Sequence, residues 1–345
     1  MELKNYQRKV IDDLTRYLDL MQETNDIVKA YNMFWKGQNV PVGINGMQPY
    51  QNLIPGVPDL CLKVPTGGGK TFLACNAIAP IFDAMPMLKM KAVVWLVPSE
   101  AILTQTLAAL RNVNHPYRQA INLQFQHNVE VYTKGQLLSG QNFNITAVRE
   151  QLSIMVLSYD SFRGRKELLK AKQENSALAP MAKALGAPDM PLEDTDETAL
   201  MQIINQLNPL VIVDESHHAR SKLSKKMLQD FNPCFILDLT ATPTKESNII
   251  SYVDSIQLKK ENILIYGLAR HTELFRNLGV ADTFSMQFQN LYDLVGGKLR
   301  LATRIARIWI IDFQHLCKFS QFIQIRCAKN FFYLLLVINR HTVWI

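Results

Sequence analysis

The segment at residues 65–71, PTGGGKT, holds the residue types that bind phosphate groups. It follows an apolar run of strand length and precedes a helical sequence, which is the context that a phosphate-binding loop requires. Glycines let backbone N–H groups approach phosphates closely, and a helix N-terminus adds partial positive charge. Lys70 is expected to reach the β- and γ-phosphates of a nucleotide, and the Thr71 hydroxyl is expected to bind Mg²⁺. The candidate nucleotide-binding residues are therefore Pro65, Thr66, Gly67, Gly68, Gly69, Lys70 and Thr71.

One residue before this loop departs from the usual pattern, because Val64 stands where Gly or Ala is expected six positions before the lysine. The alternative interpretation is a glycine-rich turn that is followed by Lys and Thr by chance. The strand on one side and the helix on the other favour the phosphate loop.

Two adjacent carboxylates, Asp214 and Glu215, end a second apolar run in the sequence LVIVDESHH. In open α/β sheets, ligands bind at the carboxyl ends of the strands. Asp214 is expected to hold Mg²⁺ through its waters, and Glu215 to orient and deprotonate the attacking water, so that both are catalytic candidates with Lys70. The alternative is that the two acids cap the next helix. His217 and His218 have no cysteine or further histidine at zinc-finger spacing, so a zinc site is not expected there.

The elements that must position these residues are mostly apolar runs of strand length that alternate with helical segments. None of the runs alternates clearly between apolar and polar residues, which predicts an α/β fold with a mostly parallel sheet buried on both faces. An amphipathic helix is predicted over residues 1–20, a loop over 37–58 and a polar insertion over 171–199. The predicted strands are residues 60–64, 92–97, 154–157, 210–213 and 235–239.

Composition bounds the class of protein. The chain has 345 residues, of which 48% are hydrophobic and 19% charged, values that exclude a disordered or fibrous chain and allow about two domains. No run approaches the ~20 apolar residues of a membrane span, and the charged N-terminus does not resemble a signal peptide. The five cysteines form no CxxC pair, which predicts reduced thiols and a cytoplasmic location. The net charge of +7 arises wholly from residues 296–345 and is weak evidence for nucleic-acid binding.

A third motif, ILDLTATP at residues 236–243, completes an ordered set with PTGGGKT and DESHH. Together they resemble the first motor domain of DExH-type superfamily-two helicases, and specifically the res subunit of type III restriction enzymes, over about residues 1–260. The resemblance implies a RecA-like P-loop domain that uses ATP and Mg²⁺ as a DNA translocase or helicase, with RNA left open. It also implies a methyltransferase partner, whereas the lack of a long apolar run argues against membrane association.

The resemblance adds roles at matching positions. The sequence LKNYQ resembles an adenine-recognition element, with Tyr6 and Gln7 as candidates, since a Gln amide can both donate to and accept from adenine. The sequences VPSEAILTQT and LSYDSF resemble motifs that contact a nucleic-acid backbone without reading its sequence. The remaining candidates are Pro98, Ser99, Gln105 and Ser158 for nucleic-acid contact, and His217, Thr240 and Thr242 for coupling hydrolysis to strand movement.

The resemblance stops near Asn262. The Gly-Arg signature of a second motor domain is missing, and the nearest basic cluster, at residues 298–307, does not match it. We therefore expect one ATP-binding domain at residues 1–262 and a tail at 263–345 that is a non-native reading of a truncated gene or a remnant of a second domain. The alternatives are a module that binds ATP and DNA without turnover, because it lacks arginine fingers, and a small-molecule kinase.

Overall fold

The computed structural model of the chain describes residues 2–162, 165–214 and 222–254. The chain divides into two units, residues 1–263 and 264–345, and every described residue belongs to the first. The predicted tail, including the basic cluster at residues 298–307, lies outside the described residues, so the predicted domain boundary near Asn262 stays a prediction.

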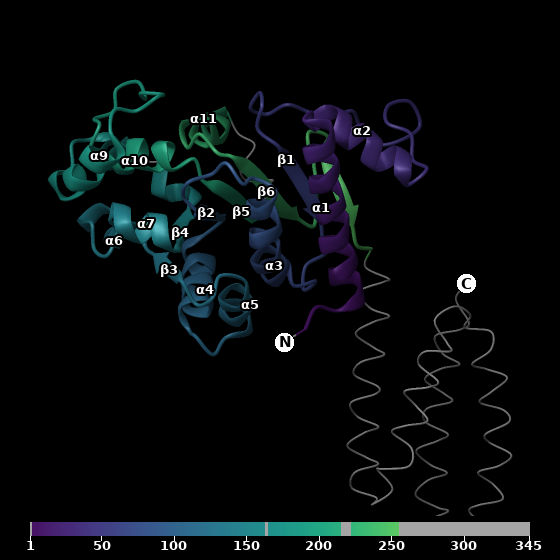
Figure 1. Ribbon diagram of the computed structural model, residues 1–345, viewed down its shortest axis with the longest axis horizontal. Helices are drawn as coiled ribbons and strands as arrows, with labels where there is room; N and C mark the ends of the chain where they lie inside the picture. Colours follow the sequence, from purple (N-terminus) through teal and green to yellow (C-terminus); the bar gives the residue numbers. More distant parts are fainter. Residues whose placement is uncertain (1, 163–164, 215–221, 255–345) are drawn as a thin grey trace, which may run out of the picture. The chain divides into compact units, whose positions relative to one another are not determined.

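Within the described residues, seven strands form one sheet in the order β3-β4-β2-β5-β6-β1-β7, and each neighbouring pair is parallel (Figure 1). The fold is thus the predicted α/β, RecA-like architecture. The strands are β1 Asp59–Lys63, β2 Ala92–Val97, β3 Val129–Tyr132, β4 Leu152–Ser158, β5 Leu210–Asp214, β6 Phe235–Thr240 and β7 Ile249–Tyr252.

The five predicted strands are confirmed to within two residues, whereas β3 and β7 were not predicted. Both missed strands contain four residues and lie at the two edges of the sheet. An edge strand has a neighbour on one side only, so it needs no long apolar run, and Glu130 interrupts β3.

Helices cover both faces of the sheet (Figure 1). Successive strand residues point to opposite faces, so Val93 and Trp95 join one core while Val94 and Leu96 join the other. The first core is covered by α1 Asn5–Thr24, α2 Ile27–Gly37, α3 Lys70–Asp83, α4 Glu100–Arg111 and α5 Pro116–Gln124. The second core is covered by α6 Lys134–Ser139, α7 Ile145–Glu150, α8 Arg165–Lys172, α9 Ala179–Leu185, α10 Leu200–Leu207 and α11 Lys222–Asp230, with 3₁₀ turns at Tyr159–Phe162 and Ser176–Leu178.

The predicted N-terminal helix over residues 1–20 is α1, which begins and ends about four residues later and stops at Asn25 in the left-handed conformation. Its apolar side, with Val10, Leu14 and Tyr17, is buried in the first core. The predicted loop at 37–58 contains no helix or strand except Gly37, the last residue of α2, and the polar insertion at 171–199 contains the end of α8, a 3₁₀ turn and α9. Within the described residues, no helix combines the length and apolar character that a bilayer crossing needs.

Candidate nucleotide site at the carboxyl edge of the sheet

Three adjacent strands bring the predicted catalytic segments to one edge. In the sheet, β6 lies between β5 and β1. The last residue of β6, Thr240, pairs with Lys63 of β1, and the last residue of β5, Asp214, pairs with Leu239 of β6. The phosphate loop, Thr240 and Asp214 therefore lie together at the carboxyl edge, which is where ligands bind in open parallel sheets.

The loop is a tight turn that leads into α3. The Gly68 N–H donates to the Pro65 carbonyl at 2.9 Å, and Gly67 has a φ of +78°, as the third residue of a type II turn requires. Gly69 caps α3 with a φ of +75°, and its carbonyl accepts from the Leu73 N–H at 2.9 Å. Lys70 and Thr71 are the half-buried first two residues of α3. The helix N-terminus thus begins at the lysine, as the sequence predicted.

Val64, which departs from the usual loop pattern, is fully buried in the first core. Its N–H donates to the Thr240 carbonyl at 3.0 Å, so the chain leaves β1 still bonded to β6. A larger side chain than Gly or Ala is accommodated because it points into the core and not into the loop. The departure does not disturb the strand, loop and helix arrangement.

The Gly68 carbonyl accepts two side-chain hydrogen bonds from α1. The Tyr6 hydroxyl donates to it at 3.0 Å and the Gln7 Nε2 at 3.2 Å, while the Gln7 Oε1 accepts from the Lys4 N–H at 3.0 Å. A backbone donor on one side and a backbone acceptor on the other determine which amide atom is oxygen and which is nitrogen. Tyr6 and Gln7 are 6% and 2% exposed. The two adenine-recognition candidates are therefore buried against the phosphate loop.

The oxygen groups at this edge suit a magnesium ion. Asp214 is half-buried at the end of β5, and Thr71 offers a hydroxyl at the start of α3. Carboxylate and hydroxyl oxygens are hard donors of the kind Mg²⁺ prefers when it also binds substrate phosphates. Gly67 has open space where a Cβ would lie, which leaves that side of the loop accessible. Glu215 and His217 lie outside the described residues.

The motif TATP forms the end of β6 and the turn after it. Thr240 is fully buried, and its Oγ1 accepts from the Thr242 N–H at 3.1 Å. The Thr240 carbonyl also accepts from the Val64 N–H, so the TATP turn and the residue before the phosphate loop are joined by a backbone hydrogen bond. The coupling role that the resemblance implied for Thr240 and Thr242 stays a prediction.

The candidate nucleic-acid contacts follow β2 and β4 at the same edge. Pro98 is half-buried, and Ser99 caps α4 by accepting from the Ile102 N–H at 3.4 Å, while Gln105 is exposed on α4. Ser158 ends β4 opposite Val97 and is fully buried.

The Ser158 hydroxyl donates to Glu100 Oε1 at 2.6 Å and lies 3.0 Å from Ser161 Oγ. Sequence reasoning missed Glu100, although it lies inside the quoted VPSEA segment. A carboxylate in the first turn of a helix that follows a strand end was the available signal.

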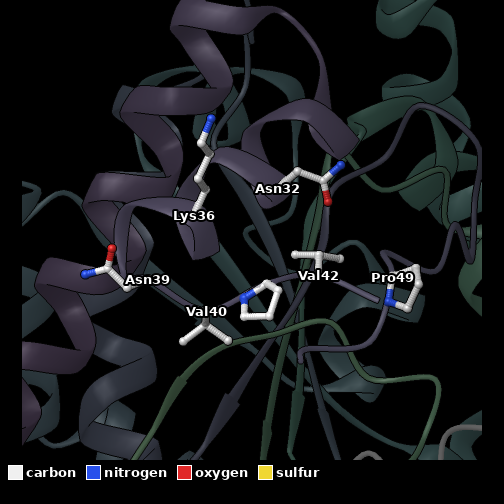
Figure 2. Close-up of a pocket in the computed structure, with 7 residues that line it drawn as sticks. Asn32, Lys36, Asn39, Val40, Val42 and Pro49 are labelled. Atoms are coloured by element: carbon white, nitrogen blue, oxygen red, sulfur yellow. The ribbon is translucent and has the colours of Figure 1, made fainter. Parts of the chain in front are cut away.

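A hollow of about 740 Å³ lies elsewhere, between α2 and the loop that follows it (Figure 2). None of the predicted site residues lines it, so the candidate nucleotide site is the sheet edge and not this hollow. The lining residues are Asn32, Lys36, Asn39, Val40, Pro41, Val42 and Pro49.

The cysteines of the described residues take no part in the site. Cys61, Cys75 and Cys234 are free thiols, as the sequence predicted. Cys75 lies in α3 near the loop, but burial raises its thiol pKa far above the ordinary value. Burial likewise raises the pKa of Cys234 to about 12. Neither thiol is ionised near neutral pH, so neither is an activated nucleophile.

Comparison with known proteins identifies one matching family model, described as type III restriction enzyme, res subunit, over residues 1–245. Among solved structures, the chain is similar to a nuclease-deletion mutant of the type ISP restriction-modification enzyme LlaGI in complex with a DNA substrate mimic, with 14% identity and a TM-score of 0.40. That alignment covers 85% of this chain and 24% of the other, so the chain spans about a quarter of that protein's length. No curated protein matches the chain significantly.

Proposed function

Because the chain belongs to the family of type III restriction enzyme res subunits and carries its helicase-type motor domain, we propose that residues 1–262 bind and hydrolyse ATP with Mg²⁺ and couple hydrolysis to DNA. The observation that supports this most directly is the meeting of three sequence segments on adjacent strands. The phosphate loop after β1, Thr240 at the end of β6 and Asp214 at the end of β5 lie at one edge.

Each residue has a role in this proposal that follows from its chemistry. The turn at residues 65–69 presents backbone N–H groups to the phosphates, and Lys70 neutralises charge on the β- and γ-phosphates. Thr71 and Asp214 would hold Mg²⁺, which would supply positive charge against the negative charge of the phosphates. Glu215 orients the attacking water and accepts its proton. Tyr6 and Gln7 are the proposed contacts for the adenine base. In the structure both side chains donate to the Gly68 carbonyl.

The DNA-binding part of the proposal concerns the ends of β2 and β4, which lie on the side of β5 opposite to β6 and β1. Pro98 and Ser99 follow β2, Gln105 is exposed on α4, and Ser158 ends β4. Contacts of this kind to the sugar-phosphate backbone carry no sequence information. A contact by Ser158 would require it to leave its buried position and its bond to Glu100. His217, Thr240 and Thr242 connect these contacts to hydrolysis, and a methyltransferase subunit is the proposed partner.

The test is Mg²⁺-dependent ATP hydrolysis by the full chain, with and without duplex DNA. Lys70→Ala is expected to abolish nucleotide binding, because it removes the cation at the phosphates. Glu215→Gln is expected to retain binding and to lose hydrolysis by at least ~10²-fold, because the amide cannot accept the proton. Lys29→Ala on the exposed surface of α2 is the matched lysine control and leaves both properties unchanged.

Three outcomes separate the alternatives. Hydrolysis that DNA stimulates, and that Glu215→Gln removes, supports a motor. ATP binding by the full chain without turnover supports the non-catalytic binding module. Consumption of a small phosphate acceptor together with ATP would contradict both and support the kinase.

A further inference from the structure

Two side chains of the first helix, Tyr6 and Gln7, donate to the same atom of the phosphate loop, the Gly68 carbonyl oxygen. A carbonyl oxygen has two lone pairs, and here two buried donors use both. Hydrogen bonds away from water hold their geometry more firmly than exposed ones. The orientation of this carbonyl is therefore determined by α1 and not by the loop alone.

The loop needs such an anchor because of its glycines. The peptide between Gly68 and Gly69 has no Cβ on either side, so steric clashes restrict its rotation less than in other sequences. A trans peptide plane directs its carbonyl and its N–H to opposite sides. Holding the Gly68 carbonyl toward α1 therefore directs the Gly69 N–H away from α1.

The Gln7 side chain also packs closely against Gly69, the next residue of the loop. A Cβ placed on Gly69 would lie 2.6 Å from Gln7 Nε2, so the amide occupies the space beside the helix cap. Gln7 is in turn held by the Lys4 N–H at the start of α1. Both ends of the Gln7 amide thus bond to backbone groups: the oxygen fixes the side chain to the start of α1, and the nitrogen donates to the loop.

We infer that Tyr6 and Gln7 are positioning residues for the phosphate loop, which preorganise the Gly68–Gly69 peptide for the polyphosphate whatever base the nucleotide carries. The inference rests on the proposed ATP-binding function. It differs from the adenine contact that the resemblance implied, because a base contact affects only adenine nucleotides, whereas a loop anchor affects every ligand that carries a triphosphate.

The experiment measures binding of ATP, GTP and magnesium tripolyphosphate to the full chain, in competition with a fluorescent ATP analogue. Tyr6→Phe removes one hydroxyl and Gln7→Met removes the amide with little change of shape. Tyr17→Phe is the matched control, because the Tyr17 hydroxyl of the same helix also donates to a backbone carbonyl, that of Ile27, at 3.1 Å. Thermal unfolding of every variant shows that it is folded.

Tyr6→Phe and Gln7→Met are each expected to weaken all three ligands by the same factor of about threefold to tenfold, the effect of one or two buried hydrogen bonds. Tyr17→Phe lowers stability without changing any of the three affinities. The inference is overturned if Gln7→Met weakens ATP alone, or if Tyr6→Phe leaves all three affinities unchanged while the wild-type chain binds them. A wild-type chain that binds none of the three overturns the proposed function and this inference together.

Discussion

Gly69 is the residue at which the phosphate loop and the first helix constrain each other most. Its φ of +75° is a backbone conformation that costs an L-residue about 1–2 kcal/mol. The space for a side chain is also taken, since a Cβ would lie 2.6 Å from Gln7 Nε2. The backbone conformation therefore favours glycine, and any larger residue would also have to displace the buried Gln7 amide from its hydrogen bond to Gly68.

Gly69→Ala is expected to lower the free energy of unfolding in urea by more than Gly56→Ala does. Gly56 is the matched control, because its φ is +80° but no atom lies within 4 Å of its added Cβ. The difference should be at least about 1 kcal/mol, which is the contribution of overpacking. Adding Gln7→Ala should recover part of the loss at Gly69, since it removes the atom that clashes. Equal losses in the two glycine variants would contradict this account.

At the scale of elements, the segment between α2 and β1 has no helix or strand, and one side chain at the start of β7 holds it. The Asn248 Oδ1 accepts from the Gln51 N–H at 2.7 Å, and its Nδ2 donates to the Gln51 and Asp59 carbonyls at 2.9 Å each. Asn248 is 2% exposed. It therefore joins the loop, β1 and β7 through backbone groups that lie nearly 200 residues from it in sequence.

Asn248→Ala is expected to lower the free energy of unfolding by about 2–4 kcal/mol, because it leaves backbone groups of the loop without their partners. Asn248→Asp keeps the acceptor for Gln51 but directs a second oxygen at two carbonyls, and should be at least as destabilising. Asn52→Ala, an exposed position in the same loop, should change stability by less than about 0.5 kcal/mol. Urea denaturation measures all three, and a neutral Asn248→Ala would show that the loop is held by other contacts.

At the scale of the whole molecule, the sheet extends beyond the segment that the family model matches. The match ends at residue 245, whereas β7 spans Ile249–Tyr252 and pairs with β1. Ile250 and Val253 are almost fully buried, Ser251 Oγ donates to Asp13 Oδ2 at 2.6 Å, and the Ile249 carbonyl accepts from Trp35 Nε1 at 3.1 Å. This strand joins α1 and α2 to the sheet, so it belongs to the folding unit.

A chain that ends at residue 254 is therefore expected to unfold cooperatively, whereas one that ends at residue 245 is expected to be strongly destabilised. Burial of Ile250 and Val253 alone contributes about 3–6 kcal/mol, a large part of the stability of a single domain. Circular dichroism during thermal unfolding compares both with the full chain. If the chain ending at 254 lacked a cooperative transition, residues beyond 254 would be required for folding, and the expectation that residues 2–254 suffice would be wrong.

The central strands could be predicted from the sequence because burial on both faces leaves long apolar runs. The residues 92–97 and 235–239 are examples, and both were placed within one residue. The edge strands β3 and β7 could not be predicted, because each has only four residues and a neighbouring strand on one side only, and therefore shows no long apolar run. The order of the strands could not be predicted from the sequence pattern either, since it depends on which strands pair.

The arrangement of strand, glycine turn and helix could be predicted from the sequence alone, because the three are consecutive along residues 59–83. Only the tertiary structure decided which distant side chains meet there. Tyr6 and Gln7 lie about sixty residues from Gly68 in the chain, and Glu100 lies 58 residues from Ser158. Such contacts depend on how α1 packs on α3 and how β2 pairs with β4, and no local pattern of residues carries that information.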